Sequence, residues 1–312
     1  MSCLFGLSRP TRLNSMRRKF LCGLVASLSA VPLAAQSVPA RDLWEFPLGA
    51  VLEPAALATE PGGGLWNPAS SHIRGPERWR VGVASLGTAA SQSVDGQLVA
   101  ANLRRTDGMT VGLSIARTSV ASILRTETDP TSLGDVPYSS MLFSLTAARE
   151  VLPHVIAGVS ARFREGRADR FVRNAIAADL GVIVHSLPVL DARLAVSSFL
   201  WRPGREIEDR PAIVAAGDVR VMGVTDRETR LGYSFNGVNR GAKELGPFVA
   251  WRFDRVDLRA AYLRTTASGR TVSRVRSGVA LHYAQFVVGV AREEGTTGLG
   301  PLYQFTLSSL LR

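Results

Sequence analysis

Four histidines are the first residues in this sequence that suggest chemistry, because imidazole binds metals and moves protons near neutral pH. They are His72, His154, His185 and His282. Zinc sites draw their ligands from short, regular spacings, whereas these four lie far apart, and three of them fall beside predicted turns. We therefore interpret the histidines as interfacial or capping residues and expect no metal site.

Hydrolysis and phosphate binding are the other chemistries that the residue types bring to mind. A serine nucleophile needs a histidine within hydrogen-bond reach, and no local pattern sets this up, although His282 with Ser273 or Ser277 stays open. The glycine triplet at 62–64 lacks the Lys-Ser/Thr pair of a phosphate loop and does not stand between a strand and a helix. We expect neither an enzyme nor a bound cofactor.

The first 35 residues have the order of a secretory signal. Five basic residues and no acid precede an apolar run at 20–33, and small residues follow it up to Ala35. That run is shorter than the roughly 20 residues that a transmembrane helix needs. We predict a signal peptide over 1–35, cleaved after Ala35. A retained anchor, a start at Met16 and twin-arginine export through 17–21 are the alternatives.

Removal of this segment changes both the cysteine content and the charge. Cys3 and Cys22 both lie in it, so the mature chain has no cysteine, which excludes disulfides, zinc–thiolate sites and a cysteine nucleophile. It also carries five units of the formal net charge of +11, which leaves +6 on the mature chain. An exported chain leaves the compartment that contains the genome. We therefore expect no nucleic acid partner and attribute the charge to a lumen or to an anionic lipid surface.

The segment 36–77 differs from the rest of the chain. It has no sustained alternation of polar and apolar residues, and its prolines are incompatible with a central strand. These prolines are Pro39, Pro47, Pro54, Pro61, Pro68 and Pro76. We predict an irregular, compact segment with one helical turn around 54–59, where Pro54 takes an early helical position.

From residue 78 onward, segments of about 9 to 12 residues alternate apolar with small or polar positions, which is typical of strands. In the segment 109–118, Met109, Val111 and Leu113 point one way, while Thr110 and Gly112 point the other. We place about 14 such strands, by the usual length of membrane strands. They lie near 78–87, 94–105, 109–118, 137–149, 154–165, 172–185, 190–201, 213–222, 227–236, 246–253, 256–266, 272–282, 285–292 and 300–311.

The connections between these strands alternate in length. The connections that follow the second, fourth and later even-numbered strands are short. Those that follow odd-numbered strands are mostly longer, notably 119–136, 202–212 and 237–245. Short turns on one side and longer loops on the other are typical of outer-membrane barrels. We predict an all-β protein, a transmembrane antiparallel β-barrel of about 14 strands over 78–312, with 36–77 as an N-terminal plug. The alternative is a soluble β-sandwich or barrel, against which the strand length argues, because sandwich strands average about 5 or 6 residues.

Charged residues recur on the face opposite the apolar one. On the lipid face each would cost roughly 2–4 kcal/mol near the midplane, so we assign them to the lumen. They are Arg162, Arg164, Asp179, Arg193, Asp218, Arg220, Arg230, Arg252, Arg259, Arg274 and Arg276. The predicted lumen is polar, carries both signs and is dominated by arginine.

A short motif lies between the predicted signal and the first strand. It comprises Gly64, Leu65, Trp66, Asn67, Pro68 and Ala69. Together with the strand count, it resembles the FadL-like outer-membrane barrels, in which a similar Asn-Pro-Ala segment closes the N-terminal region. This chain has Ser70 where that group usually has glycine, and the upstream Gly-Gly-Ala run is reduced to Leu48-Gly49-Ala50. The group includes long-chain fatty-acid and hydrocarbon transporters and the PorV/PorQ-type proteins of type IX secretion.

The resemblance implies a location in the bacterial outer membrane after cleavage of the export signal, with membrane lipid as a partner. It implies two functions of different classes. The first is a plugged channel for uptake of small hydrophobic molecules, gated by 36–77; the second is a non-transporting PorV/PorQ-type scaffold that binds secretion or surface-attachment proteins. A general hydrophilic pore would fit the charged lumen but not the plug. The motif itself either contacts cargo or only anchors the plug, and the sequence does not identify a cargo.

Overall fold

The computed structural model describes most of the chain after the predicted signal. The described residues are 40, 43, 48–59, 61–88, 94–121, 123, 125, 134–187, 191–201, 212–224, 227–237, 243–267, 270–295 and 301–312. The predicted signal peptide, its cleavage site and both cysteines lie outside them, as does most of 36–47. Within these ranges, no helix is long and apolar enough to cross a membrane.

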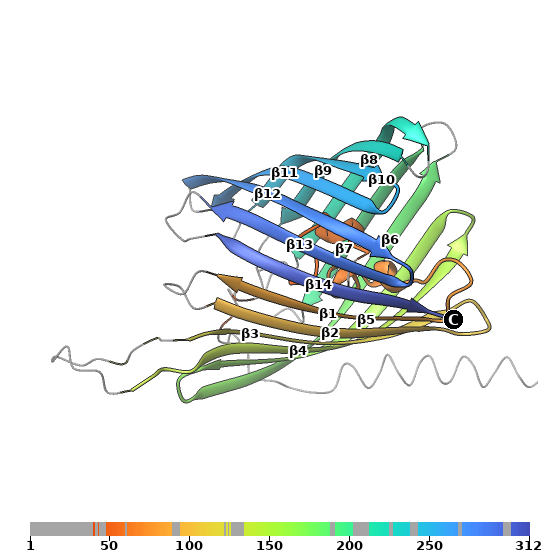
Figure 1. Cartoon of the computed structure of the whole chain (residues 1–312). Coiled ribbons are helices and arrows are strands. Elements are labelled where there is room, and N and C mark those ends of the chain that lie inside the picture. The colour runs from red at the N-terminus through yellow and green to blue at the C-terminus, as the bar shows by residue number, and fades with distance from the viewer. Residues whose placement is uncertain are drawn as a thin grey trace, which may run out of the picture. The chain divides into compact units, whose positions relative to one another are not determined.

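The described residues form fourteen β-strands that close into an antiparallel barrel (Figure 1). Each strand pairs with the next along the chain, and β1 pairs with β14, so that Trp79 faces Leu311 and Thr88 faces Leu302. The strands are β1 (Trp79–Thr88), β2 (Val94–Arg104), β3 (Thr110–Val120), β4 (Tyr138–Leu152), β5 (Val155–Ala168), β6 (Phe171–Leu187), β7 (Ala192–Trp201), β8 (Ala212–Val224), β9 (Arg227–Gly237), β10 (Lys243–Phe253), β11 (Val256–Ala267), β12 (Arg270–Tyr283), β13 (Phe286–Gly295) and β14 (Leu302–Leu311).

The predicted fold class is confirmed, because each predicted strand has its counterpart and the sheet closes on itself. The β-sandwich alternative is wrong, since a sandwich would leave open edges between two sheets. Strands run from 10 to 17 residues, as membrane-crossing strands require. Irregular pairing occurs at three places in the ladders, 150/152, 184/187 and 220/222, all near turns on the side where β1 begins and β14 ends.

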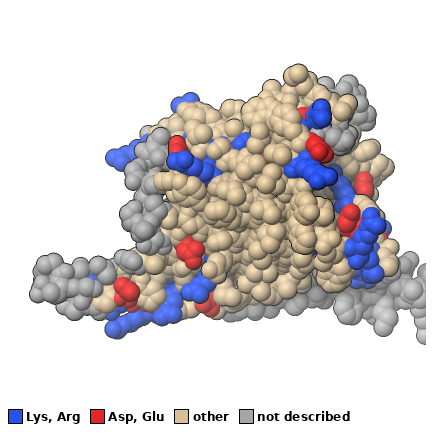
Figure 2. All heavy atoms as spheres, in the orientation of Figure 1, with Lys and Arg blue, Asp and Glu red and all other residues tan. Residues whose placement is uncertain are grey.

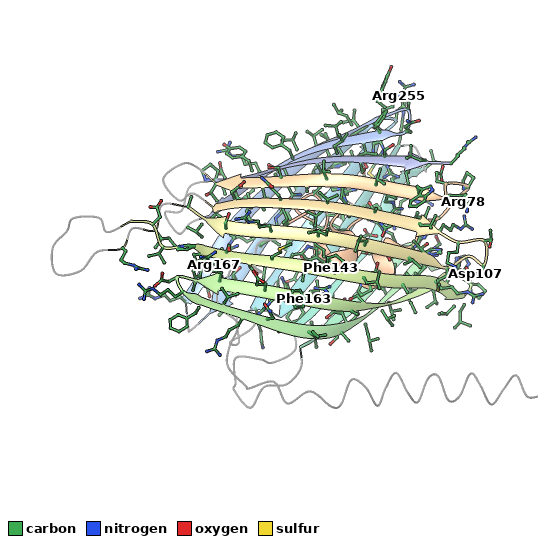
Figure 3. All side chains as sticks on the ribbon, turned by 90° about the horizontal axis from the view of Figure 1, so that it is seen from below. Arg78, Asp107, Phe143, Phe163, Arg167 and Arg255 are labelled. Atoms are coloured by element: carbon green, nitrogen blue, oxygen red, sulfur yellow. The ribbon has the colours of Figure 1, made fainter. Side chains whose placement is uncertain are left out.

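The outer surface of the barrel is an apolar belt. Along β3, Leu113 and Ile115 are exposed while Thr110 and Ser114 are buried, and the other strands repeat this alternation. Figure 2 shows a broad uncharged band with charged side chains gathered at its two ends. In Figure 3, Phe143 and Phe163 lie midway along β4 and β5, with Asp107 toward one end and Arg167 toward the other. A continuous apolar surface of this kind suits lipid and would be unstable in water.

The lumen holds the plug, of which residues 48–59 and 61–77 are described. It forms three short helical turns, drawn in orange inside the ring of strands in Figure 1: η2 (Ala55–Leu57), α2 (Gly63–Trp66) and η3 (Pro68–Ser71). The helical turn expected around 54–59 is η2, which follows Pro54. The other two turns were not expected; in α2 the first two residues are glycines, which disfavour helices in isolation.

Close packing explains two glycines of the triplet, Gly62 and Gly63. A Cβ at Gly62 would lie 2.5 Å from the carbonyl oxygen of Leu48, and one at Gly63 would collide with the carbonyl oxygen of Ala58. Only glycine lets these turns of the plug approach one another so closely. Gly62 and Gly63 therefore allow the plug to pack on itself.

The core of the molecule lies between plug and wall, in two clusters. The first, the Leu52 cluster, joins the plug residues Leu48, Val51, Leu52 and Leu65 to wall residues that include Leu86, Leu98 and Leu142. The second, the Phe248 cluster, joins Ala56, Leu57 and Ala69 to wall residues that include Ile156, Ile183, Val214 and Phe248. Part of the inner wall is thus apolar, which the sequence analysis did not predict.

Candidate functional site

Asn67 ties the three turns of the plug together. Its side chain is fully buried; its Nδ2 donates to the carbonyl oxygen of Ala56 (2.8 Å), and its Oδ1 accepts from the backbone N–H of Ala69 (3.1 Å). Pro68 follows as the first residue of η3. Asparagine bonds readily to backbone two residues on, and proline fixes the turn after it. These contacts give the Asn-Pro-Ala motif an anchoring role within the plug.

A pair of wall glycines receives this motif. Gly158 of β5 and Gly181 of β6 face each other across the sheet. A Cβ at Gly158 would lie 2.5 Å from the carbonyl carbon of Pro68, and one at Gly181 would collide with Asn67 Oδ1. The bare backbone at these two positions therefore forms a flat seat on which the plug rests.

Leu52 occupies a second seat on the opposite part of the wall. A Cβ at Gly289 of β13 would lie 2.5 Å from Leu52 Cδ1, and one at Gly278 of β12 would collide with Leu52 Cδ2. Nearby, the backbone N–H of Gly49 donates to the buried Gln304 Oε1 of β14 (2.9 Å). The plug therefore contacts both sides of the ring.

Trp66 lies between these two seats. Its partly buried ring packs against both the Leu52 cluster and the Phe248 cluster, and its Nε1 donates to the carbonyl oxygen of Leu48 (3.1 Å). A tryptophan in this setting buries a large apolar body while its N–H keeps a partner. Trp66 also lines a small cavity together with Val214 and Arg276.

A buried charge pair lies beneath the plug. Arg162 of β5 pairs with Asp179 of β6, and Arg162 also donates to the carbonyl oxygen of Leu65 at the end of α2. Ser160 Oγ donates to Asp179 Oδ2 (2.9 Å). Because an arginine and an aspartate are stable in such a place only when paired, this cluster joins the wall to α2.

All eleven charged residues assigned to the lumen lie on the inner face of the wall. Arg162, Arg164, Asp179, Asp218 and Arg230 are buried, and Arg193, Arg220, Arg252, Arg259, Arg274 and Arg276 are half-buried. Those on β7 to β12, together with their carboxylate partners as far as Glu293 on β13, form a charged surface. Its pairs include Arg193 with Asp218, Arg230 with Asp218 and Glu228, Arg220 with Asp191, Arg252 with Asp257, Arg259 with Glu53, and Arg274 and Arg276 with Glu293.

The sequence analysis missed most of the carboxylates in this surface, so the expected excess of arginine is largely offset. Asp257 is the second residue of β11, while Glu244 and Glu293 lie just outside the predicted strand ends. The alternation of polar and apolar residues shows which face a residue lies on only inside a strand. At strand ends the sequence therefore indicates the inner or outer face only weakly. Glu53 comes from the plug, where no alternation exists.

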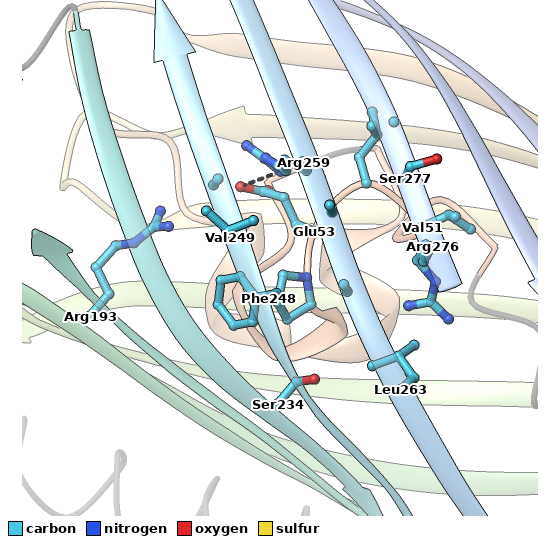
Figure 4. A pocket seen from close by; sticks show the side chains of 16 residues that line it. Val51, Glu53, Arg193, Ser234, Phe248, Val249, Arg259, Leu263, Arg276 and Ser277 are labelled. Carbon is cyan, nitrogen blue, oxygen red and sulfur yellow. Dashed lines mark ion pairs between the residues drawn. The ribbon is translucent and has the colours of Figure 1, made fainter. Parts of the chain in front are cut away.

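Three small cavities follow this charged surface along the wall from β7 to β12. Two of them have volumes of about 30 Å³ and the third of about 40 Å³. The cavity near the β10–β11 turn shares Arg193 and Arg259 with the middle one, which in turn shares Pro54 and Arg276 with the cavity beside Trp66. Figure 4 shows the middle cavity, where Arg193, Arg259 and Arg276 surround apolar residues and Glu53. Each cavity holds water-sized molecules only.

The histidines take separate roles, all at the end of the barrel where β1 begins and β14 ends. His154 and His185 stack edge to face, with ring centroids 5.4 Å apart. His282 Nε2 lies 3.1 Å from Asp257 Oδ2, on the inner face of β12, whereas Ser273 and Ser277 are on its outer face. The Ser–His pair that the sequence left open is therefore not formed. Within the described part of the chain, no group of three or more His, Cys, Asp or Glu side chains is arranged to hold a metal ion.

His72 anchors the last part of the plug to β3. Thr110 Oγ1 lies 3.3 Å from His72 Nδ1 and accepts from the backbone N–H of Ile73 (3.2 Å). Burial, followed by the charges of Arg74 and Arg104, lowers the pKa of His72 from its ordinary value of 6.5. The neutral ring can accept from the Thr110 hydroxyl, so this contact is present at neutral pH and is weakened as acid protonates His72.

The sequence matches no protein-family model and no curated protein. Among solved structures, the chain is similar to the CymD monoaromatic hydrocarbon channel, with 10% identity and a TM-score of 0.56 over 81% of this chain and 93% of that one. It is also similar to the TodX deltaS2S3 mutant monoaromatic hydrocarbon channel, with 10% identity and a TM-score of 0.51 over 84% and 98%. At such low identity the similarity shows a shared barrel fold.

Proposed function

We propose that this chain is a bacterial outer-membrane channel, exported by its N-terminal signal, that takes up small hydrophobic molecules past a movable plug. The observation that carries the proposal is the seating of the plug against apolar residues of the inner wall in the Leu52 and Phe248 clusters. A polar pore would have no reason to present apolar side chains to its lumen. The similarity in fold to two monoaromatic hydrocarbon channels supports the same class of cargo.

The plug must move for such a molecule to pass. The three cavities beside it measure about 30 to 40 Å³, whereas an engineered cavity that binds benzene measures about 150 Å³. In the proposed cycle, the plug leaves one of its seats and the apolar wall residues beneath it receive the hydrophobic cargo. The lipid partner is the bilayer around the outer belt.

The second candidate function is a non-transporting scaffold of the PorV/PorQ type, which would bind proteins of a secretion or surface-attachment machine. The closed state favours it, because the three cavities described between plug and wall are each too small for such a cargo. A scaffold needs no moving plug. The two functions therefore differ in a measurable property, namely whether hydrophobic solutes cross the membrane through the barrel.

Uptake of labelled toluene and of a labelled sugar tests the proposal in host cells that lack their own hydrocarbon channels. We expect the intact chain to speed toluene entry without speeding sugar entry. Trp66→Ala should raise toluene entry about tenfold, the factor that roughly 1.4 kcal/mol of lost plug attachment produces. Trp66 contacts both clusters, so its removal loosens both.

Trp79→Ala is the matched control, because Trp79 is exposed on the outer surface at the start of β1 and makes no contact with either cluster. It should leave entry of both solutes unchanged. If neither solute enters faster with the intact chain or with Trp66→Ala, the channel proposal fails and the scaffold is the better account.

A further inference from the structure

Glu53 is a carboxylate that the plug places on the charged wall. Its side chain is 4% exposed, and its Oε1 lies 2.8 Å from Nη1 of Arg259 on β11 (Figure 4). Its other oxygen accepts from the Thr59 hydroxyl (2.6 Å) and from the Thr59 backbone N–H. The plug therefore forms an ion pair with the wall through a carboxylate that its own fold holds in place.

From β7 to β13, the arginines and carboxylates that form ion pairs on the lumen side are equal in number only when the plug is seated. Among the described residues from Asp191 to Glu293, seven arginines make ion pairs on the lumen side: Arg193, Arg220, Arg230, Arg252, Arg259, Arg274 and Arg276. Six wall carboxylates pair with them: Asp191, Asp218, Glu228, Glu244, Asp257 and Glu293. Glu53 is the seventh acid. When the plug leaves, Arg259 keeps a longer contact, with Nη2 3.7 Å from Asp257 Oδ2. Asp257 is already paired with Arg252, whose Nε lies 2.8 Å from Asp257 Oδ1.

The surroundings of Arg259 suit an anion that carries an apolar body. The middle cavity brings Arg193, Arg259 and Arg276 together with Phe248 and Leu263, and the only carboxylate among its lining residues is Glu53. Arg259 also lines the neighbouring cavity toward the β10–β11 turn. Its guanidinium is therefore bordered by space on a second side, where Glu228 and Asp257 also line the cavity.

We propose that Arg259 is an anion-binding site that Glu53 fills in the closed state, and that an organic carboxylate with an apolar body releases the plug by taking the place of Glu53. The inference rests on the proposed function, since it needs a plug that moves. The incoming carboxylate accepts the hydrogen bond that Glu53 gave up, and its apolar part contacts Phe248 and Leu263. No covalent step is involved.

Thiol labelling of the plug tests this exchange in the predicted mature chain, residues 36–312, purified in detergent. Ala50 is fully buried in the plug, and the predicted mature chain has no cysteine, so Ala50→Cys gives a single thiol that reacts with a maleimide only when the plug is released. Benzoate is the anionic probe, and benzyl alcohol is a neutral probe with the same ring. We expect benzoate to raise the labelling rate about tenfold and benzyl alcohol to leave it unchanged.

Two substitutions in the Ala50→Cys background make the test specific. Glu53→Gln should raise the labelling rate without any probe, and benzoate should add little to it. Arg259→Gln should abolish the response to benzoate, while Arg167→Gln, which changes an exposed arginine at the end of β5, should keep it. Equal responses to benzoate and benzyl alcohol, or a benzoate response that survives in Arg259→Gln, would overturn the proposal. The proposal is also overturned if the Glu53→Gln variant is labelled at the same rate as Ala50→Cys alone. This outcome can be read even if Arg259→Gln does not fold.

The labelling result and the toluene result separate the two proposals. Toluene entry together with labelling that ignores benzoate would refute the Arg259 site and leave the channel intact. Benzoate-dependent labelling without toluene entry would support the site and refute hydrocarbon uptake.

Discussion

Replacing Gly158 with valine should unseat the plug and open the barrel to ions. A Cβ at this position would lie 2.5 Å from the carbonyl carbon of Pro68, so the backbone of the plug, and not only a side chain, must move. Overpacking of this kind costs about 1–3 kcal/mol, which raises the population of the unseated plug by roughly one to two orders of magnitude. The measurement is the frequency of open events in planar bilayer recordings.

Gly87→Val is the matched control for this experiment. Gly87 belongs to β1, and a Cβ there meets no heavy atom within 4 Å. Opening events should be as rare in Gly87→Val as in the unmodified chain. If Gly158→Val also opens no more often, the glycine seat does not hold the plug.

The largest loss of stability should come from Arg162→Met. This change removes the partner of Asp179, which is fully buried, and it also removes the hydrogen bond to the Leu65 carbonyl. Breaking a buried pair on one side costs about 3–5 kcal/mol, because the remaining buried carboxylate loses its opposite charge. The loss is measured as the free energy of unfolding in urea. The gel mobility of unboiled protein reports the folded fraction at each urea concentration.

The double variant Arg162→Met/Asp179→Leu should recover a large part of that stability, since it removes both charges together. Arg167→Met changes an exposed arginine of the same strand and should be close to neutral. An Arg162→Met variant as stable as Arg167→Met would show that the pair contributes nothing to the barrel.

The strands of the wall could be predicted because lipid requires an apolar side chain at every outward-facing position. In β3 and β5, apolar side chains point to lipid at every second residue, and this gives both the strand and its inner face. Arg162 and Asp179 could be assigned to the lumen for that reason. The signal weakens at strand ends such as Glu293, where alternation no longer defines a face.

The site between plug and wall was not predictable, because it depends on contacts that form only when the ring closes. Gly158 reads in the sequence as one more small residue on an inner face, and nothing nearby indicates that Pro68, 90 residues earlier, will lie against it. The ion pair of Glu53 with Arg259 joins residues that are even farther apart in the chain. The Asn-Pro-Ala motif gave the position of the plug in the sequence, but only the structure pairs it with its seat.

The central claim is that the plug gates hydrophobic uptake, and locking the plug tests it most directly. A Cβ at Gly289 would lie 2.5 Å from Leu52 Cδ1, so Leu52→Cys with Gly289→Cys brings two thiols within reach of a disulfide. We predict that the oxidised double variant admits toluene no faster than cells without the channel, and that a reductant restores entry, while either single variant is insensitive to redox state. Equal toluene entry through the oxidised and the reduced double variant would contradict the claim.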